Sequence, residues 1–370
     1  MRWKFIKYFV TFDAFSGSNK DGNHSNKACQ KLAKIAIQSF LVTLLGLCFL
    51  CPHAQSKVIR LNEVDLAGKH FPYLYQWYDS ELQPKAIVIA IHGLTLHGLV
   101  YDHLARHLAE QGMLVLAPDL PGYGRRWHKE DASYAQAQET VLAIAQAAKA
   151  TYKNLPVICL GESLGANLAL GAAQIKPDLV DGIVLSSPAL KTRMNLTPKS
   201  IISRVNMVVS FVKPDTVVDL SPYMRAYASE DPGIIQTMLN DPLIHRQLKC
   251  QELWDSYQSM KPVFKQASLI SKTTPVLIFQ GSQDKILQPK AIIKLVSSLN
   301  SDDQTVKWYK NRGHMILAEC QPKADVLATL DDWVQTHING QWLEVKTSTA
   351  VPVTSSLPPL TQTLINAKSN

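Results

Sequence analysis

The chain has 370 residues, 46% of them hydrophobic, which is enough to bury one large core or two modest ones. Its formal net charge of +8 at first suggests a nucleic-acid or anionic-membrane partner. However, residues 1–57 carry eight Lys or Arg against two Asp, so the rest of the chain is nearly balanced. This distribution argues against a nucleic-acid partner.

Residues 1–57 have the pattern of a signal peptide or a membrane anchor. Lysines up to Lys34 precede an apolar run, Ile35–Cys51, which Pro52 ends. The run is shorter than the roughly 20 residues of a spanning helix. Ala54-Gln55-Ser56 then offers small residues where a signal peptidase cleaves. The long amino-terminal region favours a retained anchor instead, and a buried helix of the domain is a third alternative.

The lysine-rich side of this segment should stay in the cytoplasm. The rest of the chain is therefore expected to be exported, or anchored on the non-cytoplasmic side, which in a bacterium is the periplasm. Three of the six cysteines lie in the segment, and Cys159, Cys250 and Cys320 are widely spaced along the remainder. This odd set predicts no disulfide framework. The sequence leaves the oligomeric state open.

Residues 58–339 predict an α/β domain, because short apolar runs alternate with helical patterns. Most runs are continuous β-branched or Leu segments, as in a mostly parallel sheet with helices on both faces. An antiparallel edge pair is expected first, at Val58–Val64 and Tyr73–Tyr78. The strands expected next are Ala86–Ile91, Met113–Ala117, Val157–Leu160, Gly182–Leu185, Val276–Gln280 and Val306–Tyr309. The expected helices are Tyr101–Gln111, Tyr134–Tyr152, Ala166–Ala173, Lys290–Leu299 and Lys323–Thr336.

The alternation breaks between about residues 191 and 272, which predicts a helical cap inserted over the carboxyl edge of the sheet. A helical apolar stripe in this insertion either packs onto the domain, lines an acyl-chain pocket or touches lipid. The stripe consists of Ile201, Ile202, Val205, Val208, Val209 and Val212. Residues 340–370 are rich in Ser, Thr and Pro, and a disordered tail is expected there.

Ser163 is the centre of Gly161-Glu162-Ser163-Leu164-Gly165, between the expected strand Val157–Leu160 and the expected helix Ala166–Ala173. A serine on a strained strand-to-helix turn exposes its hydroxyl at the edge of a sheet. Glycines on both sides avoid collisions with the neighbouring strand and helix. A glycine-flanked serine alone is often only a turn, but this context predicts a nucleophile.

Such a serine needs a base that a carboxylate orients, and both are expected later in the chain. Asp284 follows the expected strand Val276–Gln280 and is the predicted acid. The alternatives Asp302 and Asp303 precede the next strand and would lie at the wrong end of the sheet. His314 follows the last expected strand and is the predicted base.

An oxyanion loop is expected directly after the strand Ala86–Ile91, where His92 stands. The His92 ring should therefore brace that loop rather than take the proton of the serine. The backbone N–H groups of Leu94 and Leu164 are predicted to bind the developing oxyanion.

Two further patterns, a possible acyltransferase string and possible metal ligands, are not assigned a function. His97 and Asp102 match a His-x4-Asp acyltransferase string, but the string overlaps the oxyanion loop, and the match is attributed to chance. The remaining histidines and the cysteines lack the close paired spacing of metal ligands. No metal and no cofactor is expected.

Taken together, these residues resemble the monoacylglycerol lipase and lysophospholipase branch of the α/β-hydrolases, which are serine aminopeptidase S33-type hydrolases. The resemblance covers roughly Ala86 to Trp333. Its segments are His92-Gly93-Leu94, Ala117-Pro118-Asp119-Leu120-Pro121-Gly122-Tyr123-Gly124, the Gly161–Gly165 turn, Ser187-Pro188-Ala189-Leu190, Asp231-Pro232, Asn240-Asp241-Pro242-Leu243-Ile244-His245, Gly281-Ser282-Gln283-Asp284 and Gly313-His314 with Glu319.

The resemblance implies an α/β-hydrolase fold and a serine esterase that acts on single-chain lipid esters beneath a mobile cap. Glu162 departs from the family pattern, since many members carry His before the nucleophile, and it should alter the charge beside the site. The expected enzyme is a monoacylglycerol lipase or lysophospholipase that forms an acyl-enzyme on Ser163. The alternatives are an acyltransferase or amidase with the same triad and a non-catalytic lipid-binding protein.

Overall fold

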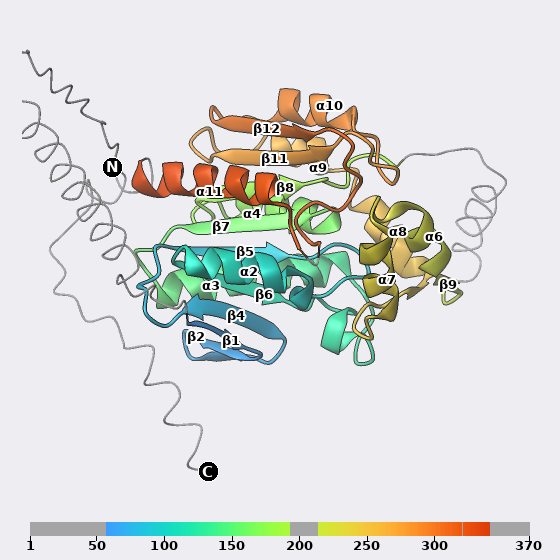
Figure 1. Cartoon of the computed structure of the whole chain (residues 1–370), viewed down its shortest axis with the longest axis horizontal. Helices are drawn as coiled ribbons and strands as arrows, with labels where there is room; N and C mark the ends of the chain where they lie inside the picture. Colours follow the sequence, from blue (N-terminus) through green and yellow to red (C-terminus); the bar gives the residue numbers. More distant parts are fainter. Residues whose placement is uncertain (1–56, 193–213, 320, 341–370) are drawn as a thin grey trace, which may run out of the picture. The chain divides into compact units, whose positions relative to one another are not determined.

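The computed structural model describes residues 57–192, 214–319 and 321–340 (Figure 1). The chain divides into two units, Met1–Gln55 and Ser56–Asn370, and every described residue belongs to the second. The expected targeting segment up to residue 56, the apolar stripe at 201–212 and the expected tail from residue 341 lie outside the described residues. Within the described part of the chain, no helix combines the length and the apolar composition needed to cross a bilayer.

Eight strands form one central sheet, in which all neighbours from β6 to β12 pair in parallel. The first two strands in the order, β1 and β4, pair antiparallel, and β4 is also antiparallel to β6. The order is β1 (Val58–Leu61), β4 (Leu74–Asp79), β6 (Met113–Pro118), β5 (Ala86–Ile91), β7 (Val157–Glu162), β8 (Gly182–Ser186), β11 (Val276–Gly281) and β12 (Gln304–Tyr309). The predicted α/β sheet with its antiparallel edge is confirmed.

Helices cover both faces of this sheet (Figure 1). Those of the domain are η1 (Gly98–Tyr101), α2 (Asp102–Glu110), η2 (Gly124–Arg126), α3 (Tyr134–Thr151), α4 (Leu164–Ile175), α9 (Val263–Ala267), α10 (Ala291–Ser298) and α11 (Ala324–Asn339). The five predicted helices all appear, with ends within three residues of the expected ones, and the first of them starts as the 3-10 turn η1.

Strand β5 shows why the apolar runs form a doubly covered sheet, since all six of its residues are buried. Successive side chains of a strand point to opposite faces. Ile87, Ile89 and Ile91 therefore pack in one core with α3, α4, α9 and α10, whereas the alternate residues pack in a second core with α2 and α11. A run that is apolar at every position satisfies both cores.

The amino-terminal prediction was wrong in one respect, because the expected strand Val58–Val64 is broken. β1 ends at Leu61, and a separate hairpin follows, formed by β2 (Val64–Leu66) and β3 (Lys69–Phe71). The two residues between these strands, Ala67 and Gly68, both have positive φ angles, of 50° and 75°. Such angles at both central positions define the tight turn that joins two-residue hairpins. Alanine is an unusual residue at the first of these positions, so no clear turn signal was present in the sequence.

The insertion after β8 contains short elements, which gather beyond one end of the sheet in Figure 1. They are β9 (Val217–Asp219), α6 (Ser221–Tyr227), α7 (Pro232–Asn240), β10 (Gln247–Lys249) and α8 (Cys250–Gln258). β9 and β10 pair only with each other within the described residues, so they add nothing to the central sheet. The backbone N–H of His245 donates to the Thr95 carbonyl at 3.0 Å, and the His245 ring bonds the Gly122 carbonyl. These contacts fasten the insertion to loops at the carboxyl ends of β5 and β6.

Candidate active site

Ser163 lies between the last residue of β7 and the first residue of α4. Its φ of 57° and ψ of −115° fall outside the regions that ordinary residues prefer. A Cβ atom on Gly161 would stand 2.2 Å from the Gly165 carbonyl oxygen, and one on Gly165 would stand 2.0 Å from the Ile91 carbonyl oxygen. Both glycines are therefore required by close backbone approach, as the sequence predicted. The turn holds the serine at the carboxyl edge of the sheet.

Asp284 and His314 meet at this same edge, although 30 residues separate them. The Nδ1 atom of His314 lies 2.8 Å from Oδ2 of Asp284. The other carboxylate oxygen accepts the backbone N–H groups of Ile286 and Leu287, at 2.8 and 2.9 Å. Burial alone would raise the pKa of Asp284, but the charge and hydrogen bond of His314 and these two N–H groups lower it overall. The carboxylate is thus held in one orientation in its charged form.

The alternative acids lie elsewhere. Asp303 precedes β12, and its Oδ2 is 3.0 Å from Nε2 of His337 on α11. Asp302 stands beside it at the amino end of the same strand. The structure therefore brings only Asp284, of these three carboxylates, to His314.

The Asp284 contact fixes the tautomer of His314. An ionised carboxylate only accepts hydrogen bonds, so Nδ1 carries the proton and Nε2 of the neutral ring is left free to accept one. Burial lowers the pKa of His314, but the charge and hydrogen bond of Asp284, with a contribution from Glu162, outweigh burial and raise it above 6.5. The ring has the form and the basicity that a general base needs.

Two backbone N–H groups are candidates for an oxyanion hole. Leu164 is the first residue of α4, where N–H groups have no partner within the helix and the helix dipole is positive. The loop after β5 runs beside the serine, since a Cβ atom on Gly93 would lie 3.3 Å from Cβ of Ser163. Leu94 is the next residue of that loop. The structure thus places Gly93, the neighbour of Leu94, beside Ser163, and the oxyanion role of the Leu94 and Leu164 N–H groups stays a prediction.

His92 braces this loop, as expected. Its fully buried ring accepts the backbone N–H of Leu120 at Nε2, at 3.0 Å, and donates from Nδ1 to the Gly93 carbonyl, at 2.8 Å. Burial lowers its pKa to about 4, so the ring is neutral at physiological pH. Both ring nitrogens are occupied, which leaves His92 no atom for proton transfer to a substrate.

The two residues of the His-x4-Asp string, His97 and Asp102, do not contact each other's functional atoms but have separate partners. His97 is paired with Asp241 of the cap, with Nε2 and Oδ2 2.9 Å apart. Asp102 instead accepts hydrogen bonds from Trp77 and Arg106, at 2.9 and 2.8 Å. Because the two residues of the string have separate partners, they do not form an acyltransferase site.

Glu162 was expected to alter the charge beside the site, and it acts on His314, whose pKa it helps to raise. The sequence did not predict its contacts: the side chain is 1% exposed, and its oxygens accept backbone N–H groups of the loop that follows His314. The signal available in the sequence was an acidic residue at the end of a fully buried strand. Such a group must have partners, although the sequence does not say which.

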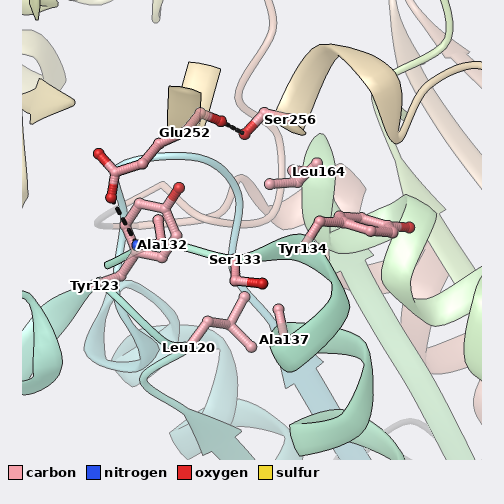
Figure 2. Close-up of a pocket in the computed structure, with 9 residues that line it drawn as sticks. All are labelled: Leu120, Tyr123, Ala132, Ser133, Tyr134, Ala137, Leu164, Glu252 and Ser256. Atoms are coloured by element: carbon pink, nitrogen blue, oxygen red, sulfur yellow. Dashed lines mark hydrogen bonds between the residues drawn. The ribbon is translucent and has the colours of Figure 1, made fainter. Parts of the chain in front are cut away.

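A small cavity lies where the cap meets the nucleophile turn (Figure 2). It is lined by Leu120, Tyr123, Ala132, Ser133, Tyr134, Ala137, Leu164, Glu252 and Ser256. Glu252 on α8 accepts the backbone N–H of Ala132 at 2.6 Å, and its carbonyl accepts the Ser256 hydroxyl at 2.9 Å. Leu164 thus presents its side chain to the seam between cap and domain, directly after Ser163.

Comparison with known proteins finds hydrolases whose sequences or folds are similar to this chain. A family model described as "Serine aminopeptidase, S33" matches residues 82–321. A monoacylglycerol lipase of Mycolicibacterium smegmatis is 27% identical over 275 residues, which cover 72% of this chain and 93% of that protein. Human monoglyceride lipase is 28% identical over 271 residues, 72% of this chain and 85% of that protein. The crystal structure of a Paleococcus ferrophilus monoacylglycerol lipase superposes with a TM-score of 0.60 at 25% identity, covering 74% of this chain and all of that one.

Proposed function

The chain belongs to the serine aminopeptidase S33 family of α/β-hydrolases and is a carboxylic ester hydrolase, and we propose that it cleaves single-chain lipid esters with Ser163 as nucleophile. Monoacylglycerols and lysophospholipids are the proposed substrates. The names of the relatives support the first class, and the cap above the nucleophile turn supports single-chain substrates in general. The observation that carries the proposal is the Asp284–His314 pair at the edge of the sheet where the strained Ser163 turn stands.

The proposed reaction proceeds in two steps. The Ser163 hydroxyl attacks the ester carbonyl while Nε2 of His314 takes its proton, and Asp284 stabilises the imidazolium that results. The N–H groups of Leu94 and Leu164 bind the oxyanion. His314 then returns the proton to the leaving alcohol, and water, activated by the same ring, releases the fatty acid. No metal or cofactor takes part in these steps.

The substrate class can be tested by competition. Purified enzyme is incubated with a fluorescent fluorophosphonate and a panel of monoacylglycerols and lysophospholipids, with an amino-acid p-nitroanilide as the amide arm. We expect the lipid esters to slow labelling of the wild-type enzyme and to release fatty acid, and we expect Ser163→Ala to remain unlabelled. Preferential cleavage of the amide would overturn the proposed substrate class.

The acyl acceptor is tested in the same assay. Water and an alcohol compete for one acyl-enzyme, so glycerol and a lysolipid are added as acceptors and the products are separated. We expect free fatty acid to dominate at every acceptor concentration. A majority of transacylated product would instead assign the chain to the acyltransferases.

The pH dependence of the reaction follows from His314. The base must be neutral to accept a proton, and its pKa is raised above 6.5 because Asp284 outweighs burial. Activity is therefore lost as the pH falls through this raised pKa, and we expect the acidic limb of kcat/KM to lie above pH 6.5. A profile measured from about pH 5 to 9 checks this. A limb below pH 6.5 would contradict the assignment of His314 as base.

We also propose that residues 1–57 bring the enzyme to a membrane or across it. The support is the lysine-rich stretch that precedes the apolar run Ile35–Cys51. Mass measurement of the amino terminus of protein recovered from fractionated cells distinguishes a cleaved signal peptide from a retained anchor. Recovery of the intact chain in the cytosolic fraction alone would contradict both.

A further inference from the structure

Glu162 links the nucleophile turn to the loop that carries His314. It is the residue before Ser163, at the end of β7, and is 1% exposed. Its carboxylate accepts the backbone N–H groups of Ile316, Leu317 and Ala318, with shortest distances of 3.0, 2.7 and 3.0 Å. These donors lie two to four residues after His314.

The His314 loop depends on such an acceptor. Its residues 310–319 contain neither helix nor strand, and the side chains of residues 314–319 are buried. Buried backbone N–H groups must find hydrogen-bond partners, and an irregular loop cannot supply them from its own backbone. Glu162 gives three consecutive N–H groups one acceptor. The Ser186 hydroxyl, 3.2 Å away, donates to Oε2 of the same carboxylate, the oxygen that also accepts the N–H groups of Leu317 and Ala318.

We propose that Glu162 is a positioning residue, which fixes His314 relative to Ser163 and stabilises the imidazolium form of His314 by its negative charge. This inference rests on the proposed function. It assigns a specific role to residue 162, the position directly before the nucleophile, where many family members carry His. The group that holds the base in place is covalently adjacent to the nucleophile, so the two reacting side chains share one rigid support.

The hydrogen bonds support a negatively charged Glu162. All of those recorded for its side chain are donated to it, and a protonated carboxyl would need an acceptor for its own hydrogen. Burial raises the pKa of Glu162 above its usual value, and His314 and the three backbone N–H groups offset only part of that rise.

Charged and titratable groups from several elements surround this pair. Asp284 faces His314, and Tyr101 and Glu319 face Glu162. From the cap, Tyr223 faces Asp284, and the Glu230 carboxylate accepts the backbone N–H of Gly313 at 2.7 Å. Burial and the charges of Glu162 and Glu230 raise the pKa of Glu319 to about 7, whereas Glu162 has donors that favour its charged form.

Glu162→Gln is the informative variant, because it keeps the shape of the side chain and one acceptor oxygen but removes the charge. We expect kcat to fall about 10- to 100-fold, as a misplaced catalytic group produces, with KM within about twofold. Loss of a nearby negative charge disfavours the imidazolium and lowers the pKa of His314. The acidic limb of kcat should therefore move to lower pH in Glu162→Gln.

Two further variants separate charge, reach and loop stability. Glu162→Asp keeps the charge but is one methylene shorter, so kcat should fall while the acidic limb moves little. Asp181→Asn is the matched control. Asp181 is partly buried and accepts the backbone N–H of Val157 at 2.7 Å, but it precedes β8, at the end of the sheet opposite Ser163. This control should lower the melting temperature and leave the acidic limb in place.

The outcomes are distinct from those that test the proposed function. If wild-type enzyme hydrolyses lipid esters and Ser163 is labelled, but Glu162→Gln has wild-type kcat, the positioning role is overturned. It is equally overturned if the loss of kcat matches the loss of folded protein and the acidic limb does not move. If wild-type enzyme shows no esterase activity and no labelling, the proposed function itself fails.

Discussion

Replacement of Ser163 by alanine should lower kcat for ester hydrolysis by roughly 10⁴- to 10⁶-fold, the loss seen when a serine hydrolase loses its nucleophile. Without the hydroxyl no acyl-enzyme can form, and only binding and the oxyanion hole remain to stabilise the transition state. The measurement is steady-state hydrolysis of a p-nitrophenyl ester and of a monoacylglycerol at saturating concentration.

The fold should survive this substitution. The backbone φ of 57° at residue 163 is no harder for alanine to adopt than for serine. The backbone hydrogen bonds of this residue to Ser186 and Ala189 do not involve the side chain. The thermal midpoint of Ser163→Ala should therefore stay close to that of the wild type. A folded variant that retained more than a few per cent of wild-type kcat would show that another residue attacks the ester.

Asp284→Asn should lower kcat by roughly 10⁴-fold while the protein stays folded. The carbonyl oxygen of asparagine can still accept the N–H groups of Ile286 and Leu287, so its amide would point at Nδ1 of His314. An amide N–H donor stabilises the tautomer that is protonated on Nε2, and that nitrogen then cannot accept the proton of Ser163. Loss of the carboxylate also lowers the pKa of His314, so the remaining activity should extend to lower pH.

A second Asp–His pair provides the control. Oδ2 of Asp303 lies 3.0 Å from Nε2 of His337 at the opposite end of β12, far along the strand from His314. Asp303→Asn should leave kcat and the pH profile within about twofold of the wild type. Equal losses in Asp284→Asn and Asp303→Asn would indicate a general effect on stability and would remove Asp284 from the proposed triad.

The sheet and the candidate triad could be predicted from the sequence for physical reasons. A strand that is buried on both faces must be apolar at every position, and β5 and β7 are such runs. In a parallel sheet, residues that follow different strands meet at one edge. The order of strands therefore placed Ser163, Asp284 and His314 at that edge without any knowledge of the loops.

The contacts of Glu162 and of the cap could not be derived in the same way. The three N–H groups that Glu162 binds are more than 150 residues away in the chain, and they are backbone groups, which carry no sequence signal. The His97–Asp241 pair likewise joins the oxyanion loop to the cap across 144 residues. The hairpin of β2 and β3 was missed for a local reason, since its turn has Ala67 at a position with a φ of 50°.

The site of covalent attack is the most direct test of the proposed mechanism. Wild-type enzyme is treated with a fluorophosphonate, digested and analysed by mass spectrometry, with Ser163→Ala and heat-denatured enzyme as controls. We predict one adduct per chain, on the peptide that contains Gly161-Glu162-Ser163-Leu164-Gly165, and none in either control. An adduct on another residue, or an active wild-type enzyme with no adduct, would contradict the assignment of Ser163 as the nucleophile.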